Sequence, residues 1–125
     1  MSIEDIKKTV DEINKYIQKE LWFDFDVFNY VRNKLTITGS IDFSVKYDIE
    51  IVFEDIAFVS LPFEWQTDTS QTVLSIIENS DEAKAINIKF QVEQGHTLFK
   101  FIPEGFPENF GCILGAKSIS YKIIK

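Results

Sequence analysis

The sequence predicts an α+β fold in which an N-terminal amphipathic helix packs on one face of a mostly antiparallel β-sheet of about six or seven strands. Two patterns predict this fold. Branched apolar residues recur at helical spacing near the start, and apolar and polar residues alternate along much of the remaining chain. Because the chain has 125 residues, we expect a single domain, residues 1–125, with a helix over 1–20 and an antiparallel sheet over 21–125.

The predicted helix begins after Ser2, which can act as its N-cap. Glu4 and Asp5 lie in its first turn, where the helix dipole favours acidic side chains. The apolar positions are three or four residues apart and form one stripe, Ile3, Ile6, Val10, Ile13 and Ile17. The stripe is short for a coiled coil, so we expect it to cover a sheet.

A period of two begins at Leu21 and predicts the first strand. Asp24 and Asp26 alternate with apolar neighbours and are expected on the solvent-facing side of an edge strand. The core side is expected to hold Leu21, Phe23, Phe25 and Val27.

The longest alternation runs from residue 35 to residue 53. Its odd positions are apolar except Gly39, and they are Leu35, Ile37, Ile41, Phe43, Val45, Tyr47, Ile49, Ile51 and Phe53. One strand of this length would span roughly 60 Å at about 3.3 Å per residue, too long for a domain with a radius of gyration of about 14 Å. Because the parity does not change, we expect an odd-length loop or a bend within residues 39–48, with even positions such as Asp48 and Glu50 facing solvent.

The middle of the chain contains shorter signals. Residues 57–63 predict a further strand that ends near Pro62, after a turn at Glu54–Asp55. Residues 64–72 are polar and loop-like. The next segment, 73–79, fits either a short strand or a helical turn.

The remaining segments complete the predicted sheet. A turn at 80–85 precedes an alternating stretch at 86–92, which predicts a strand followed by a hairpin turn. A strand follows at 97–102. Two prolines and two glycines predict a long surface loop at 103–111, and a last strand is expected at 118–124.

The net charge of −7 is concentrated in the middle of the chain, where residues 21–82 hold three bases and twelve acids. This acidity disfavours nucleic acid as a partner and favours a basic protein, a cation or simple solubility. A single cysteine cannot form an internal disulfide, and the chain has neither a signal-peptide pattern nor an apolar run long enough to cross a bilayer. We therefore expect a cytoplasmic protein without a membrane partner.

Side chains that could carry chemistry are few. His96 lies in a predicted turn and Cys112 in an apolar segment, so we interpret them as a surface histidine and a buried thiol. Asp24 and Asp26 could serve as an acid–base pair or bind Ca²⁺ or Mg²⁺, but a solvated strand face explains them as well. We expect no catalytic residues, no metal and no cofactor.

Aromatic residues suggest a binding surface instead. Phe63 and Trp65 flank Pro62 beside a polar segment and are expected to be partly exposed. Glu64 and Asp68 would surround them with negative charge, as in an interface for a basic protein.

Four segments carry a resemblance to a known group of proteins: W-x-D-F, LTITGSIDFS, DIEIVFEDIAFVSLP-x-x-W and LGAKSISY. Together they resemble small, acidic bacterial α+β proteins, some of which are similar to immunity proteins of polymorphic toxin systems. The resemblance implies stoichiometric binding and neutralisation of a toxin domain without catalysis. It supplies no ligand residues.

The leading hypothesis is therefore a non-catalytic, immunity-type inhibitor that binds a basic toxin domain through an acidic, aromatic-bearing surface. A small-ligand-binding domain with a phenylalanine-lined pocket is the alternative, and an enzyme using carboxylates is a third. A homodimer is compatible with all of them. The predicted partner-binding residues are Asp24, Asp26, Asp48, Glu50, Glu54, Glu64, Trp65 and Asp68.

Overall fold

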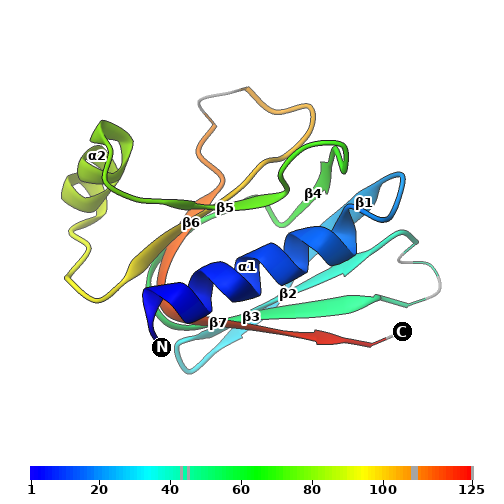
Figure 1. Cartoon of the computed structure of the whole chain (residues 1–125), viewed down its shortest axis with the longest axis horizontal. Helices are drawn as coiled ribbons and strands as arrows, with labels where there is room; N and C mark the ends of the chain where they lie inside the picture. Colours follow the sequence, from blue (N-terminus) through cyan, green and yellow to red (C-terminus); the bar gives the residue numbers. More distant parts are fainter. Residues whose placement is uncertain (43, 45, 108–109, 125) are drawn as a thin grey trace.

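The computed structural model describes residues 1–42, 44, 46–107 and 110–124, and it confirms the predicted fold class. A long helix lies against a seven-stranded antiparallel sheet, and a short second helix lies at one end (Figure 1). The elements are α1 (Ile3–Ile17), β1 (Phe23–Val31), β2 (Lys34–Ser40), β3 (Ile49–Ser60), β4 (Glu64–Thr67), β5 (Leu74–Ile77), α2 (Asp81–Phe90), β6 (Thr97–Phe101) and β7 (Ile113–Ile123).

The sheet has the strand order β4-β1-β2-β3-β7-β6-β5 and curls into a half-barrel, with α1 packed on it. Five phenylalanines fill its interior with no exposed surface, and they are Phe23, Phe25, Phe53, Phe99 and Phe101. Their rings contact one another at centroid distances between 5.0 and 6.1 Å. They therefore form a packed aromatic core.

Helix α1 begins as the sequence predicts. The Ser2 hydroxyl accepts a hydrogen bond from the Asp5 amide at 3.1 Å, and the helix buries most of its apolar stripe, Ile6, Val10, Ile13 and Ile17. Ile3, the first member of that stripe, is 41% exposed. Asn14 joins the helix to the sheet, because its side chain donates to the Leu74 carbonyl and accepts from the Leu74 amide.

The preserved parity is confirmed for residues 35–39 and 49–53, where β2 and β3 pair, but not for Tyr47 between them, whose hydroxyl donates to Glu50. In the β2–β3 pair, Leu35 lies opposite Phe53 and Ile37 opposite Ile51, and all four side chains are buried. Odd residues therefore meet odd residues on one face, as an odd-length connection requires. Two residues of the predicted odd face, Phe43 and Val45, lie outside the described residues.

The predicted turn at Glu54–Asp55 and the separate strand at 57–63 are wrong, because β3 continues from Ile49 to Ser60. Asp55 adopts a left-handed conformation with φ of 57°, and the register with β7 shifts between Ile56 and Phe58. A bulge of this kind bends a strand without ending it. The bend carries the chain to β4, which forms where a polar loop was predicted.

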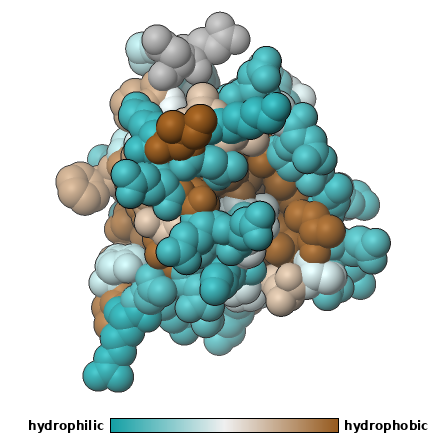
Figure 2. All heavy atoms as spheres, turned by 90° about the vertical axis from the view of Figure 1, so that its left-hand side faces the viewer, coloured by the Kyte–Doolittle hydropathy of each residue, from teal (hydrophilic) through white to brown (hydrophobic). Residues whose placement is uncertain are grey.

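The predicted turn at 80–85 and strand at 86–92 are also wrong, because these residues form α2. The Ser80 hydroxyl caps the helix by accepting from the Ala83 amide at 3.1 Å, and Asp81 and Glu82 lie in its first turn. Ala83 and Ile86 are buried in a second apolar cluster with residues of β5, β6 and β7. The end of the molecule that carries α2 is mostly hydrophilic, with separate hydrophobic patches (Figure 2).

The even-numbered face is less exposed than predicted. Thr36, Thr38 and Ser40 of the interior strand β2 are buried, and Asp48 is only 5% exposed. The expected burial of Leu21 is wrong in the opposite direction, because this side chain precedes β1 and is 89% exposed. Interior strands in a curled sheet are covered by neighbouring side chains on both faces, which alternation alone does not reveal.

Candidate functional site

Strand β1 is not an edge strand as predicted, because β4 pairs with its outer side. Asp24 lies opposite Gln66, and Asp26 lies opposite Glu64. Like charges directly opposite each other in an antiparallel pair destabilise it. The β1–β4 pair therefore keeps an unfavourable arrangement of carboxylates.

Trp65 belongs to the aromatic core, contrary to the predicted partial exposure. Its side chain is 3% exposed, and its ring centroid lies 5.5 Å from that of Phe25 and 5.0 Å from that of Phe101. The alternation within β4 explains this burial, because Trp65 faces the core between the exposed Glu64 and Gln66. The expected exposure of Phe63 is confirmed at 85%.

The chain that follows β6 brings further residues to the outer edge of β4. The Glu104 amide donates to the Gln66 carbonyl at 2.8 Å, and the Thr67 hydroxyl donates to the Ile102 carbonyl at 2.9 Å. These bonds fix Glu104, and Phe106 two residues later, beside Trp65.

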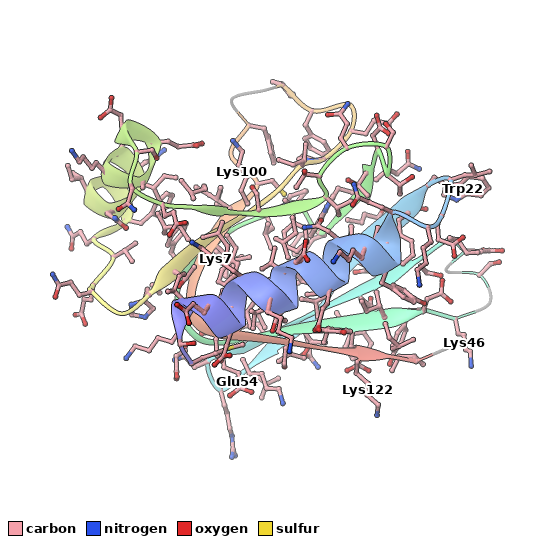
Figure 3. All side chains as sticks on the ribbon, viewed as in Figure 1. Lys7, Trp22, Lys46, Glu54, Lys100 and Lys122 are labelled. Carbon is pink, nitrogen blue, oxygen red and sulfur yellow. The ribbon has the colours of Figure 1, made fainter. Side chains whose placement is uncertain are left out.

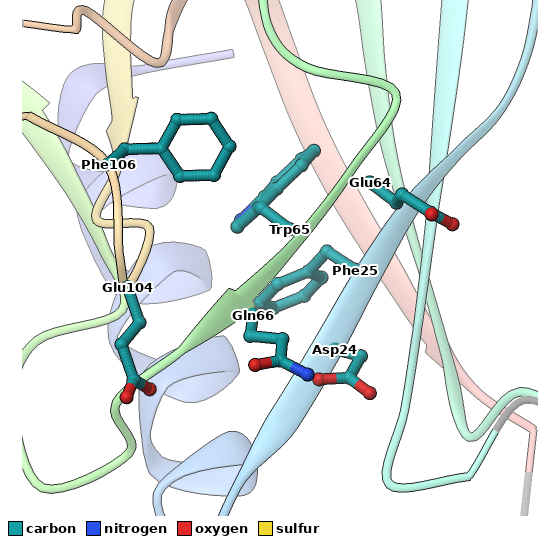
Figure 4. A pocket seen from close by; sticks show the side chains of 7 residues that line it. All are labelled: Asp24, Phe25, Glu64, Trp65, Gln66, Glu104 and Phe106. Carbon is teal, nitrogen blue, oxygen red and sulfur yellow. The ribbon is translucent and has the colours of Figure 1, made fainter.

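The three segments enclose a pocket of about 370 Å³ at this edge of the sheet (Figure 4). A volume of this size lies within the range of small-molecule and side-chain binding sites. The pocket is lined by Asp24, Phe25, Glu64, Trp65, Gln66, Glu104 and Phe106.

Two buried side-chain atoms of residues that line this pocket have no hydrogen-bond partner among the residues that the structure describes. They are the Asp24 Oδ1 and the Trp65 Nε1. In Figure 4 the Trp65 indole nitrogen lies on the side of the ring that faces Glu104 and Phe106. An unsatisfied buried donor or acceptor costs about 1–3 kcal/mol, so a hydrogen-bond partner at either atom would be stabilising.

None of the carboxylates around the pocket forms an ion pair with another described residue. We call Asp24, Asp26, Glu64 and Glu104 the acidic edge. In the part of the chain that the structure describes, the ion pairs join Lys7 to Glu78, Lys15 to Asp11 and Lys100 to Glu82, so none includes the acidic edge.

Two other predicted residues face lysines. Glu50 lies opposite Lys122 and accepts a hydrogen bond from the Tyr47 hydroxyl at 3.0 Å. Glu54 lies opposite Lys34 in the β2–β3 pair. In Figure 3 it lies at the lower side of the molecule, well away from Trp22, the residue before β1. The structure therefore does not bring these two acids to the acidic edge.

The last two predicted acids serve local structure. The Asp48 carboxylate accepts from the Ile41 amide at 3.2 Å and holds the connection between β2 and β3. Asp68 accepts from the amide and hydroxyl of Ser70, and these bonds lower the pKa of its carboxyl. Of the eight predicted residues, the structure gathers Asp24, Asp26, Glu64 and Trp65.

The sequence did not predict that residues after β6 would contribute to the site. Glu104 and Phe106 lie in the predicted loop at 103–111, and no spacing in the sequence connects them with β1 or β4. The bond between Glu104 and Gln66 spans 38 positions, so only the fold reveals it. The available sequence signal was that an acidic and an aromatic residue, Glu104 and Phe106, lie among the prolines and glycines of this loop.

Other candidate chemistry receives little support. Cys112 is buried as predicted, and burial raises the pKa of its thiol to about 12, which disfavours the reactive thiolate. Among the described residues, no group of three acidic, histidine or cysteine side chains could hold a metal ion. Within the same residues, no helix is long and apolar enough to cross a membrane.

Asp24 gives the site a measurable pH dependence. Burial raises the pKa of its carboxyl, and the charge of Glu64 raises it further. A raised native pKa means that stability is greatest below the unfolded-state pKa and falls as the pH rises through the native value. We therefore expect Asp24→Asn to raise the free energy of unfolding at neutral pH, and we expect this gain to vanish in acid.

Urea denaturation of the unchanged protein and of Asp24→Asn, from acidic to neutral pH, measures the difference in their free energies of unfolding. Glu93→Gln, at an exposed acid outside the acidic edge, is the matched control and should show no such pH-dependent gain. A loss of stability in Asp24→Asn at neutral pH would contradict the assignment of Asp24 as a partly buried carboxyl whose charge Glu64 repels.

Comparison of the chain with protein-family models, curated proteins and solved structures finds no match. The functional assignment therefore depends on the geometry of the acidic edge and its pocket.

Proposed function

We propose that the protein is a non-catalytic binding module that captures a basic partner protein through the acidic edge. The partner that the sequence resemblance favours is a toxin domain, which the module would neutralise by stoichiometric binding. Cytoplasmic location and the possibility of a homodimer remain predictions.

One observation carries this proposal: carboxylates lie opposite and beside one another on β1 and β4, and no described residue forms an ion pair with them. Asp26 opposite Glu64 costs stability in the free protein. A basic partner would relieve that repulsion, and the gain would appear as binding free energy. Charge complementarity also accelerates association and helps to select the partner.

The alternative prediction, a phenylalanine-lined pocket for a small ligand, is supported by fewer observations. Most interior phenylalanines contact one another in the core, and the pocket takes only Phe25 and Phe106 from this residue type. An organic cation small enough for this pocket is the ligand that this alternative implies.

The test uses the proteins encoded beside this chain in its genome, each purified and titrated against it by calorimetry. We expect one of them to be basic and to bind, with an affinity that falls as salt is added. The double variant Asp26→Lys/Glu64→Lys should weaken that binding by roughly tenfold or more and flatten the salt dependence.

Glu4→Lys/Glu93→Lys is the matched control, because this double variant makes the same charge change at two exposed sites outside the acidic edge. It should bind almost as the unchanged protein does. Failure of every neighbouring gene product to bind, or equal weakening by the control, would refute the proposed function.

A further inference from the structure

The geometry points to a specific occupant for the pocket: the guanidinium group of an arginine residue whose own peptide carbonyl accepts a hydrogen bond from Trp65. This inference rests on the proposed function, because it places that arginine on the basic partner. It assigns the pocket to a ligand with a cationic donor and a neutral acceptor a short distance apart.

The cationic part follows from the carboxylates. Asp24 Oδ1 is buried without a donor, and Glu64 and Glu104 line the same pocket. A hydrogen bond between a charged donor and a carboxylate is roughly twice as strong as one between neutral groups. A cation in this pocket would therefore supply the donor that Asp24 lacks and reduce the repulsion between neighbouring acids.

The acceptor follows independently from Trp65. An indole N–H can only donate, so a cation, which offers no acceptor, leaves it unsatisfied. The Trp65 side chain is 97% buried, since only 3% of its surface is exposed, and its nitrogen faces Glu104 and Phe106 in Figure 4. A peptide carbonyl is a neutral acceptor that accompanies every arginine side chain in a protein.

The aromatic lining distinguishes arginine from lysine. Phe106 is half-buried and faces the pocket together with Trp65. A planar guanidinium stacks on aromatic rings and can donate to two carboxylate oxygens at once, whereas an ammonium group is compact and more strongly hydrated. An arginine can therefore contact the rings and the carboxylates together.

Nuclear magnetic resonance tests the inference without the partner. The chain has two indole N–H signals, from Trp22 and Trp65, and Trp22→Phe assigns them. The Trp22 nitrogen already donates to the Ile41 carbonyl at 3.0 Å, so its signal is an internal control. The probe is arginine blocked at both ends as N-acetyl-arginine methylamide.

We expect the blocked arginine to shift the Trp65 signal and leave the Trp22 signal in place. Blocked citrulline, which has a neutral group of similar shape, should bind roughly tenfold or more weakly because the charge-assisted hydrogen bonds are lost. N-butylguanidine, a singly charged guanidinium without a carbonyl, should bind more weakly than blocked arginine and move the Trp65 signal less.

Variants of the protein test whether blocked arginine binds in this pocket. Asp24→Asn and Glu104→Gln should each lower the affinity for blocked arginine. Glu93→Gln should leave that affinity unchanged. Glu104 is exposed, so its variant tests the pocket even if a change at Asp24 alters the fold.

Several outcomes would overturn the inference: no shift at Trp65, an equal response to blocked citrulline, or equal binding of blocked lysine. N-butylguanidine binding more tightly than blocked arginine would also overturn it and would assign the pocket to a free small cation. None of these results bears on whether Asp26→Lys/Glu64→Lys abolishes partner binding, so the inference and the proposed function can fail separately.

Discussion

Replacing Phe53 by alanine is expected to lower the free energy of unfolding by about 3–5 kcal/mol, the range for removing a fully buried aromatic ring. Phe53 has no exposed surface and lies on β3, which pairs with β2 and β7. Its ring centroid is 5.0 Å from that of Phe99 and 6.1 Å from that of Phe101. The substitution would leave a cavity in the aromatic core, where the Phe53 ring of β3 packs against Phe99 and Phe101 of β6.

The matched control is Phe63→Ala, which removes the same atoms from a side chain that is 85% exposed. Its effect should stay within about 0.5 kcal/mol. Urea denaturation followed by tryptophan fluorescence measures both changes. Similar losses in the two variants would contradict the placement of Phe53 inside the half-barrel and Phe63 outside it.

Gly39→Ala is expected to destabilise the protein by about 1–3 kcal/mol, although it adds only a methyl group. A Cβ atom at this position would lie 2.5 Å from Phe23 Cε2 and 3.0 Å from both Ile49 Cγ2 and Phe25 Cε1. No carbon atoms approach as closely as the first of these distances, so the phenylalanine rings or the strand would have to move.

A double variant separates this clash from any backbone effect of losing glycine. Phe23→Leu shortens the side chain that the new methyl group would meet. Combined with Gly39→Ala, it should destabilise the protein by less than the sum of the two single changes, because residues in contact are not additive. Strictly additive losses, measured by the same denaturation, would mean that contact with Phe23 does not explain the need for glycine.

Gly39 also illustrates where sequence reasoning succeeded. It interrupts the apolar odd positions between residues 35 and 53, and the structure gives the reason: the odd face at this point is filled by rings from β1. The strict alternation predicted the facing of β2 and β3, since a shift by one residue would turn every core side chain toward solvent. Helix α1 was predictable for a similar reason, because the apolar residues of its stripe fit only the helical spacing of three or four residues.

Elements whose apolar residues fit two periods were not predictable in this way. Ile86, Ile88 and Phe90 alternate as in a strand, but Ile86 and Phe90 are also four apart, and the structure uses the helical spacing. Ile88 is accordingly 79% exposed. The cap at Ser80 was the local signal that favoured the helix.

The site was predicted only in part. Alternation placed Asp24 and Asp26 on one face, but it could not show that β4 pairs with β1 and brings Glu64 opposite Asp26. The same pairing buries Trp65, which its place beside Pro62 and a polar segment suggested would be partly exposed. Glu104 depends on a contact between distant segments, which has no counterpart in local sequence.

The central claim is that the pocket beside β4 recognises a positive charge, because its carboxylates form no ion pair with the other residues that the structure describes. The ratio of the affinities for blocked arginine and blocked citrulline, followed at the Trp65 indole signal, tests this claim most directly. We predict that the ratio is roughly ten or more and falls toward one in Asp24→Asn. A ratio near one in the unchanged protein would contradict the claim.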